Sequence, residues 1–176
     1  VASRTAICFS SMMVIASILS GTGFFEWIAI RSVIVSDGHP LRLLLILATI
    51  TALFSAFLDN VTTVVLIAPI TLYIAAALRV SPVPYLIAEI LASNIGGAAT
   101  LVGDPPNIII ASRAGLSFTD FLVHMLPVVL VILALFLLMA RWLFRSALVG
   151  DPERAQGLLA LDEREAITDP RLLRQS

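Results

Sequence analysis

Residues 55–66 read SAFLDNVTTVVL and place a polar spot inside a long apolar run. From residue 43 to residue 78, Asp59 is the only side chain that carries a charge at neutral pH. One straight helix of this length would measure roughly 54 Å at about 1.5 Å per residue, whereas the hydrocarbon core of a bilayer is about 30 Å thick. The chain must therefore reverse, and residues 58–63 (LDNVTT) are the polar place available for the reversal.

The composition is that of a membrane protein. Of the 176 residues, 59% are hydrophobic and 13% are charged, and the mean hydropathy is +1.02, far outside the range of soluble domains. The lipid bilayer is therefore the expected surrounding, and no nucleic-acid partner is expected. The single cysteine, Cys8, excludes an internal disulfide and a dithiol metal site within this sequence.

The apolar segments predict an all-α polytopic membrane protein. A membrane domain over residues 1–145 is expected, followed by a cytoplasmic linker over 146–176, where the apolar composition ends. The expected elements are a helix at 6–30, hairpin arms at 41–58 and 61–79, a broken helix at 84–102 and 105–115, and a helix at 120–143. Arginine placement puts the linker on the cytoplasmic side, but it leaves open whether the two arms form a re-entrant hairpin or two full spans. The chain starts without Met and stops without a closing element, so a truncated fragment is expected.

A second interruption lies at residues 101–107, LVGDPPN. Gly103 frees the backbone, Asp104 suits an N-cap and Pro105 suits the first helical position, so a half-helix should restart here. The letters LVGDP recur at residues 148–152 in a polar stretch, where they only begin a short helix in water. In the apolar copy a central Asp costs about 2.5–3.5 kcal/mol, which favours a functional role for Asp104.

Helix breaks at membrane depth persist only inside protein or beside a cavity, and secondary transporters build ion and substrate sites from them. Asp59 or Asn60 is expected to cap the returning arm, with the hydroxyls of Thr62 and Thr63 in its first turn. The carboxylates could take up a proton or a sodium ion. Sodium is a candidate at Asp59, Asn60 and Asp104, and no other metal is expected.

Three further residues are weaker candidates. Glu89 is expected to reach the cytoplasmic interface in a structural role, and His124 to be a hydrogen-bonded packing residue. Asn94 could line a site, while its small neighbours Ser93, Gly96, Gly97 and Ala98 are expected to allow close helix packing.

The segments SAFLDNVTTVVLIAPITL (55–72) and LIAEILASNIGGAATLVGDPPNIIIASRAGLSFTDFL (86–122) closely resemble the arsenical-pump membrane proteins and the melanosomal P-protein group. Both belong to the ArsB/NhaD ion-transporter superfamily, whose wider clan includes dicarboxylate and citrate carriers. The resemblance covers nearly the whole chain, and the paired motifs are highly specific.

This resemblance implies a full protein of two inverted repeats, each with a re-entrant hairpin and an unwound helix, working by elevator-type alternating access. The chain would hold the first repeat, and therefore half of the transport site. DNVTT would be the hairpin tip, facing the unwound helix across one site. The implied binding residues are Asp59, Asn60, Thr62, Thr63, Asn94, Gly97, Thr100, Asp104 and Asn107, and the implied helix-break residues are Gly96, Gly103, Pro105 and Pro106. A homodimer and an ATPase subunit are candidate partners.

The leading functional prediction is arsenite or antimonite efflux, and hence arsenical resistance, driven by a proton or sodium gradient across the cell membrane. A sodium/proton antiporter and an organic-anion carrier of the dicarboxylate or citrate kind stay open as alternatives. No cofactor and no enzymatic activity are expected. An intramembrane aspartyl protease is disfavoured, because Leu58-Asp59 and residues 101–104 match neither Tyr-Asp nor Gly-x-Gly-Asp. A scaffold would not need polar breaks at membrane depth.

Overall fold

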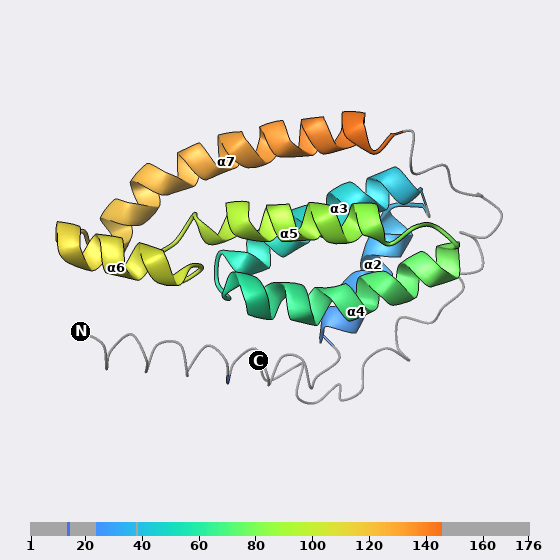
Figure 1. Cartoon of the computed structure of the whole chain (residues 1–176), viewed down its shortest axis with the longest axis horizontal. Coiled ribbons are helices and arrows are strands. Elements are labelled where there is room, and N and C mark those ends of the chain that lie inside the picture. The colour runs from blue at the N-terminus through green and yellow to red at the C-terminus, as the bar shows by residue number, and fades with distance from the viewer. Residues whose placement is uncertain (1–13, 15–23, 38, 146–176) are drawn as a thin grey trace.

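A computed structural model describes residue 14 and residues 24–37 and 39–145 of the chain. In this part all regular secondary structure is helical, as the sequence predicts (Figure 1). The helices are α2 Phe24–Val35, α3 Pro40–Ser55, α4 Asn60–Leu78, α5 Val83–Gly97, α6 Pro105–Ala114 and α7 Phe118–Leu143. The rest of the expected first helix (6–13 and 15–23), the linker at 146–176 and the second LVGDP copy lie outside the described residues.

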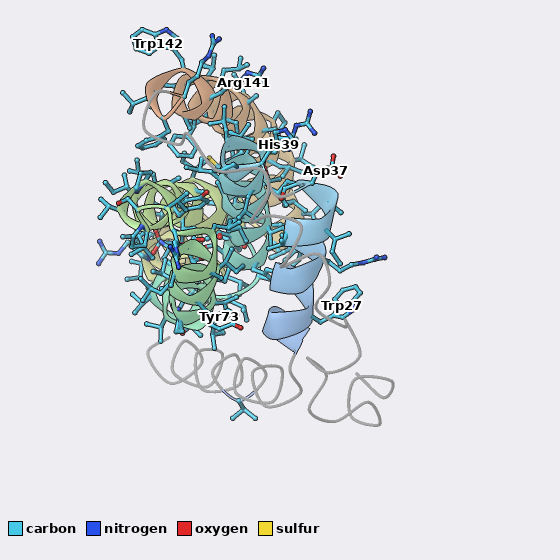
Figure 2. The ribbon with its side chains drawn as sticks, turned by 90° about the vertical axis from the view of Figure 1, so that its right-hand side faces the viewer. Trp27, Asp37, His39, Tyr73, Arg141 and Trp142 are labelled. Atoms are coloured by element: carbon cyan, nitrogen blue, oxygen red, sulfur yellow. The ribbon has the colours of Figure 1, made fainter. Side chains whose placement is uncertain are left out.

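Two of these helices, α4 and α7, are long and apolar enough to cross a membrane. Most side chains of α7 are exposed, among them Leu135, Leu138 and Trp142 at 61%, 65% and 80%. Figure 2 shows Trp142 and Tyr73 pointing away from the helical body. Apolar side chains exposed along a whole helix suit a lipid surrounding, and the described residues accordingly form an all-helical part of a membrane protein.

The hairpin forms where the sequence predicts a reversal. Pro40 opens α3, at a position where its missing N–H is not needed. The helix ends at Ser55, and α4 begins five residues later at Asn60 with Asp59 as its N-cap. The observed arms, 40–55 and 60–78, agree with the expected 41–58 and 61–79 except that the first arm ends three residues earlier.

The broken helix ends its first half at Gly97, and the expected continuation to residue 102 is wrong. Residues 98–103 form turns instead. Two glycines in succession weaken the helix at its end, and the Thr100 hydroxyl then accepts the backbone N–H groups of Val102 and Gly103. Such local side-chain bonds compete with helix formation, so the helix restarts only at Pro105.

The expected end of the first helix, 6–30, is too early, since α2 continues to Val35. Ser32 donates its hydroxyl to the Ile28 carbonyl, and Ser36 donates to Val33 at the helix end. Both serines are buried. The Ser32 hydroxyl is satisfied within the helix, which is why Ser32 does not mark a loop, whereas Ser36 lies in the turn that follows α2.

The packing core lies between α3 and α5, the helix pair with the most extensive contact. These helices run in the same direction: the Tyr85 hydroxyl bonds the Pro40 carbonyl at one end, and Ser93 contacts Ser55 at the other. α5 carries a stripe of small residues, Ala88, Ala92 and Gly96, on one face. A methyl group added at Gly96 would overlap the Ala52 backbone of α3. Small residues let the two backbones approach closely, as expected for Gly96.

The remaining helices frame this core. α4 packs against α5 on one side, and α7 crosses over α3 and α5 (Figure 1). α6 lies at the end of the structure where α7 begins. A capping box between Ser117 and Asp120 stabilises the start of α7. The helix begins at Phe118, two residues before the expected start at 120.

Candidate functional site

The two helix breaks lie side by side in the structure. The Thr100 hydroxyl in the unwound segment donates to the carbonyl of Ala56 in the hairpin turn. The Asn60 amide at the start of α4 donates to the Asn94 side chain in the last turn of α5, at 3.4 Å. These bonds join segments 44 and 34 residues apart in the chain, so the tertiary fold brings the hairpin tip against the broken helix.

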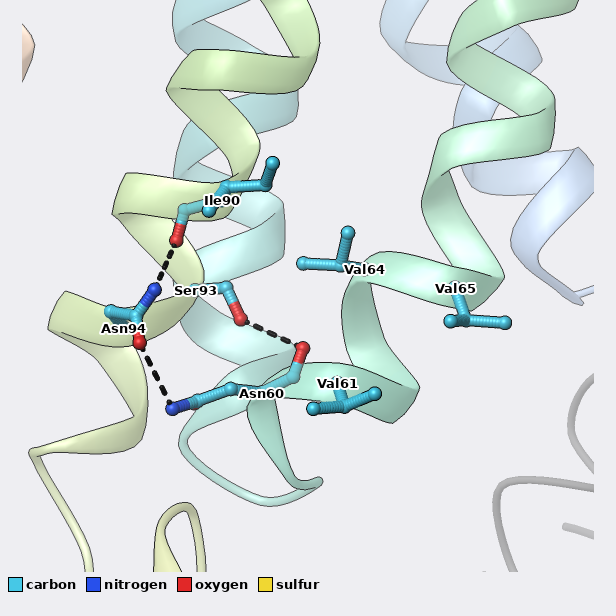
Figure 3. Close-up of a pocket in the computed structure, with 7 residues that line it drawn as sticks. All are labelled: Asn60, Val61, Val64, Val65, Ile90, Ser93 and Asn94. Carbon is cyan, nitrogen blue, oxygen red and sulfur yellow. Dashed lines mark hydrogen bonds between the residues drawn. The ribbon is translucent and has the colours of Figure 1, made fainter.

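A hydroxyl network holds the tip in place. Ser55 donates to the Asn60 side-chain oxygen at 2.6 Å and lies 3.1 Å from the Ser93 hydroxyl. Ser93 in turn donates to the Asn60 backbone carbonyl at 3.1 Å (Figure 3). Ser55 was not among the expected site residues, and Ser93 was expected only to allow close packing. Both serines lie within a few residues of an expected site residue, and the sequence held no other indication of their role in the site.

The unwound segment is fixed by Asn107. Its side-chain N–H₂ donates to the carbonyls of Gly97 and Thr100, at 3.2 and 2.9 Å. Gly97 has no room for a side chain, because a Cβ there would overlap the Asn60 side chain. At Gly103 an added Cβ would lie 2.5 Å from the Ser55 carbonyl oxygen. Gly103 does not have a positive φ, so the close approach of the hairpin, rather than backbone freedom, requires the glycine.

The two aspartates occupy matching positions but differ in their bonds. Asp59 caps α4: its carboxylate accepts the Thr62 backbone N–H at 2.8 Å and the Thr62 hydroxyl at 2.7 Å. Asp104 stands at the N-cap of α6 but makes no side-chain cap bond, contrary to the sequence-based expectation. A cap accepts the N–H of the second or third helical residue. Pro106 has no N–H, and the Asn107 N–H bonds the Asp104 backbone carbonyl instead, so the Asp104 carboxylate is not used by the helix.

Two buried polar residues lie deeper between the helices. Thr63 is fully buried, and its hydroxyl has no hydrogen-bond partner among the described residues. Glu89 is 1% exposed, so it does not reach an interface as expected. One oxygen of its carboxyl group accepts a hydrogen bond from Thr71, and within the described structure the other oxygen has no partner.

His124 was expected to be a hydrogen-bonded packing residue. It is exposed instead, and a ring nitrogen forms a hydrogen bond with the Asp120 carbonyl.

An open pocket of about 270 Å³ lies between the start of α4 and the end of α5 (Figure 3). Its lining residues are Asn60, Val61, Val64, Val65, Ile90, Ser93 and Asn94. The Asn94 side chain is held there by its own bond to the Ile90 carbonyl, at 2.7 Å. The pocket thus has amide groups beside an apolar wall, and the Asn94 amide is the exposed one. Among the described residues no group of three His, Cys, Asp or Glu side chains could hold a metal ion.

The structure therefore gathers the expected residues into one region. Asn60, Asn94, Gly97, Thr100 and Asn107 are joined by hydrogen bonds or direct contact. Asp59 and Thr62 lie at the hairpin tip, and Asp104 at the restart of the broken helix. Their part in binding a substrate or an ion stays a prediction.

Comparison with known protein families gives one match over the full length: residues 1–176 match the citrate transporter family model. A 46 kDa membrane protein of Mycobacterium leprae is 56% identical over 163 residues, which cover 93% of this chain and 38% of that protein. A protein of Mycobacterium tuberculosis named as an uncharacterized transporter is 55% identical over 162 residues, 92% of this chain and 38% of that protein. The human P protein is 43% identical over 139 residues, 76% of this chain and 17% of that protein.

These matches confirm the expected likeness to the P-protein group and to a family of membrane transporters. The chain spans 38% of the length of its mycobacterial relatives. The names of this family and of these relatives do not mention arsenite, so the arsenical-pump assignment stays a prediction.

Proposed function

The chain belongs to the citrate transporter family, and from that premise we propose that it supplies half of the transport site of a secondary carrier for small carboxylate anions. The observation that carries this proposal is the meeting of the two helix breaks, held by bonds from Thr100 to Ala56 and from Asn60 to Asn94. Transporters place substrate and ion sites where interrupted helices meet near the middle of the membrane.

The lengths of the helices support a site inside the bilayer. α3 and α5 run in the same direction from a common end and have 16 and 15 residues. At 1.5 Å per residue they are about 24 and 22 Å long, so both breaks lie at nearly the same depth and short of a core about 30 Å thick. This depth favours a re-entrant hairpin over two full spans.

The charges at the site favour ion-coupled transport. The pocket is lined by the side-chain amides of Asn60 and Asn94, while Asp59 and Asp104 stand at the two breaks. An anion bound near two carboxylates is repelled unless a cation or a proton enters with it, because like charges interact strongly in a medium of low dielectric constant. A carrier that moves the anion together with a positive ion removes this repulsion.

Arsenite or antimonite efflux is the second candidate. Neutral amide and hydroxyl groups can hydrogen-bond an uncharged oxyacid such as arsenous acid as well as a carboxylate. Such a site would act without thiolates, since the one cysteine in the chain, Cys8, is far in sequence from both breaks. Sodium/proton antiport is the third candidate, with the two aspartates as cation ligands.

The rest of the proposed transporter is taken from the family resemblance. The proposal includes a second, inverted repeat that completes the site, elevator-type movement, a homodimer and a multi-pass position in the cell membrane. Arg42, Arg79 and Arg141 belong to the ends of α3, α4 and α7 that meet opposite the hairpin tip. By the positive-inside rule this end is cytoplasmic.

The test is transport by the full-length protein in proteoliposomes, with labelled citrate, succinate and arsenite offered under a proton gradient or a sodium gradient. Gradient-driven uptake of a carboxylate supports the proposal. Arsenite uptake without carboxylate uptake would establish the second candidate. Collapse of the proton gradient by sodium alone, with no substrate moved, would establish antiport.

A further inference from the structure

Glu89 is a carboxylic acid in the packed interior of the helical body. It lies on α5 with 1% of its surface exposed. The neighbouring buried residues on its own helix are Tyr85, Ala88, Ala92 and Ser93. One carboxyl oxygen accepts the Thr71 hydroxyl of α4 at 2.5 Å, and the other has no partner within the described chain.

No positive charge compensates this group in the described structure. Arg42 pairs with Asp37 on the exposed surface, away from Glu89. α4 presents Thr71 to Glu89, and its titratable residue Tyr73 is 65% exposed. α3 carries Arg42 as its only titratable residue, and α7 carries Asp120, His124 and Arg141, all of them exposed. On α5 itself the Tyr85 hydroxyl is bonded to the Pro40 carbonyl.

An ionised carboxylate in such a place is strongly disfavoured. Moving an isolated charge from water into an apolar interior costs many kcal/mol, so the group takes up a proton instead. A single hydroxyl donor does not offset that cost, because a buried charge needs both a partner ion and satisfied hydrogen bonds. These surroundings favour the protonated, neutral form of Glu89 in the conformation described by the structure.

We propose that Glu89 is the residue that carries the coupling proton of the transporter. This inference rests on the proposed function, in which a cation or a proton enters with the anion, and it assigns that proton to one residue. Glu89 binds one proton as Glu–COOH in the packed conformation, and it releases that proton as Glu–COO⁻ when movement of α5 relative to α4 opens it to water. One proton then crosses the membrane in each cycle, and no other reactant is consumed.

The position of Glu89 links the proton to the substrate. Ser93 lies one helical turn further along α5, on the same face, because residues four apart are neighbours on a helix. Ser93 contacts both Ser55 and Asn60 at the hairpin tip. α4 carries Thr71 as well as Asn60, so a shift between α4 and α5 changes the surroundings of the carboxyl group and of the substrate pocket together.

The experiment uses the full-length protein in proteoliposomes and compares wild type, Glu89→Gln and Asp120→Asn. Two activities are measured: exchange of labelled for unlabelled substrate, which needs no net proton movement, and accumulation driven by a pH gradient. Glutamine has the shape of the protonated acid and cannot release a proton. We expect Glu89→Gln to keep exchange and to lose accumulation, while Asp120→Asn, which removes an exposed carboxylate outside the site, keeps both.

The outcomes separate the two proposals. If wild type exchanges none of the tested substrates, the proposed function fails. If wild type exchanges and Glu89→Gln still accumulates substrate with the pH gradient, the proton-site inference is overturned.

A second measurement tests the inference in case the Glu89→Gln variant does not fold. Infrared spectra of the wild-type protein at neutral pH should contain the carbonyl stretch of a protonated carboxyl group, and Glu89→Asp should shift that band. Wild-type spectra without any neutral carboxyl band would also overturn the inference.

Discussion

Replacement of Gly96 by alanine should loosen the contact between α3 and α5 that holds the two breaks together. A Cβ at this position would lie 2.6 Å from two backbone carbons of Ala52, and closer still to its carbonyl oxygen. Ordinary contact begins at 3.4 Å, so the helices would have to separate by about 0.8 Å or more in a closely packed interior. Backbone atoms cannot turn aside as a flexible side chain can.

The size of the effect follows from three contributions. Overpacking costs about 1–3 kcal/mol, and weakening the nearby contact of Ser93 with Ser55 costs about 1 kcal/mol more. Alanine gains about 1 kcal/mol over glycine in helix propensity. We expect Gly96→Ala to lower the free energy of unfolding by about 1–3 kcal/mol.

The assay is thermal unfolding of the detergent-solubilised full-length protein, followed by circular dichroism. Gly115→Asn is the matched control, because nothing lies within 4 Å of an added Cβ there, and asparagine tolerates the left-handed backbone of that residue. The control should leave the unfolding temperature nearly unchanged. If Gly96→Ala raised the unfolding temperature, as it would in an exposed helix, the close approach of α5 to Ala52 would be refuted.

Three further predictions concern polar groups. Asp59→Asn should change the free energy of unfolding by less than about 0.5 kcal/mol, since both residues cap helices well, while transport by the full-length protein falls; a large loss of stability would show that the carboxylate is structural. Thr63→Val should leave unfolding unchanged or stabilise the protein by up to about 1 kcal/mol, because it removes a buried hydroxyl without a partner; destabilisation would reveal a partner outside the described chain. Ser117→Ala should destabilise α7 by about 1 kcal/mol by removing the capping box, and Ser117→Thr should restore stability in the same unfolding assay.

The reversal of the hairpin could be predicted from the sequence, because an apolar run too long for one span with a single charged spot leaves few places to turn. The Gly-Asp-Pro stretch likewise predicted the restart of a helix at Pro105. In both cases local backbone chemistry and the thickness of a membrane were sufficient.

The end of α5 and the true surroundings of Glu89 could not be predicted in this way. The helix ends at Gly97 because the Thr100 hydroxyl accepts the backbone N–H of Gly103 and the Asn107 side chain donates to the Gly97 carbonyl. Asn107 lies ten residues after Gly97, which is beyond the reach of a local sequence pattern. Glu89 looked like a residue near an interface because its distance along the helix was known but its facing neighbours on α4 were not.

The hydrogen bonds of Asp59 and Asp104 could not be predicted from the capping pattern of the sequence alone. The same reasoning predicted a cap at each break, yet only Asp59 bonds its helix through the side chain. Pro106 has no N–H to donate to a cap, and the N–H of Asn107 bonds the Asp104 backbone carbonyl instead. The Asp104 carboxylate is therefore not bonded to its helix.

The most direct test of the account is citrate binding by the full-length protein, measured by isothermal titration for wild type, Asn94→Ala and Ile87→Ala. Asn94 is exposed and lines the pocket, whereas Ile87, 43% exposed on the same helix, is not among the lining residues. If the hairpin tip and the broken helix form the substrate site, Asn94→Ala should weaken binding by about tenfold or more, the effect of losing about 1.4 kcal/mol, and Ile87→Ala should bind as wild type does. Equal affinity in a folded Asn94→Ala protein would contradict the account.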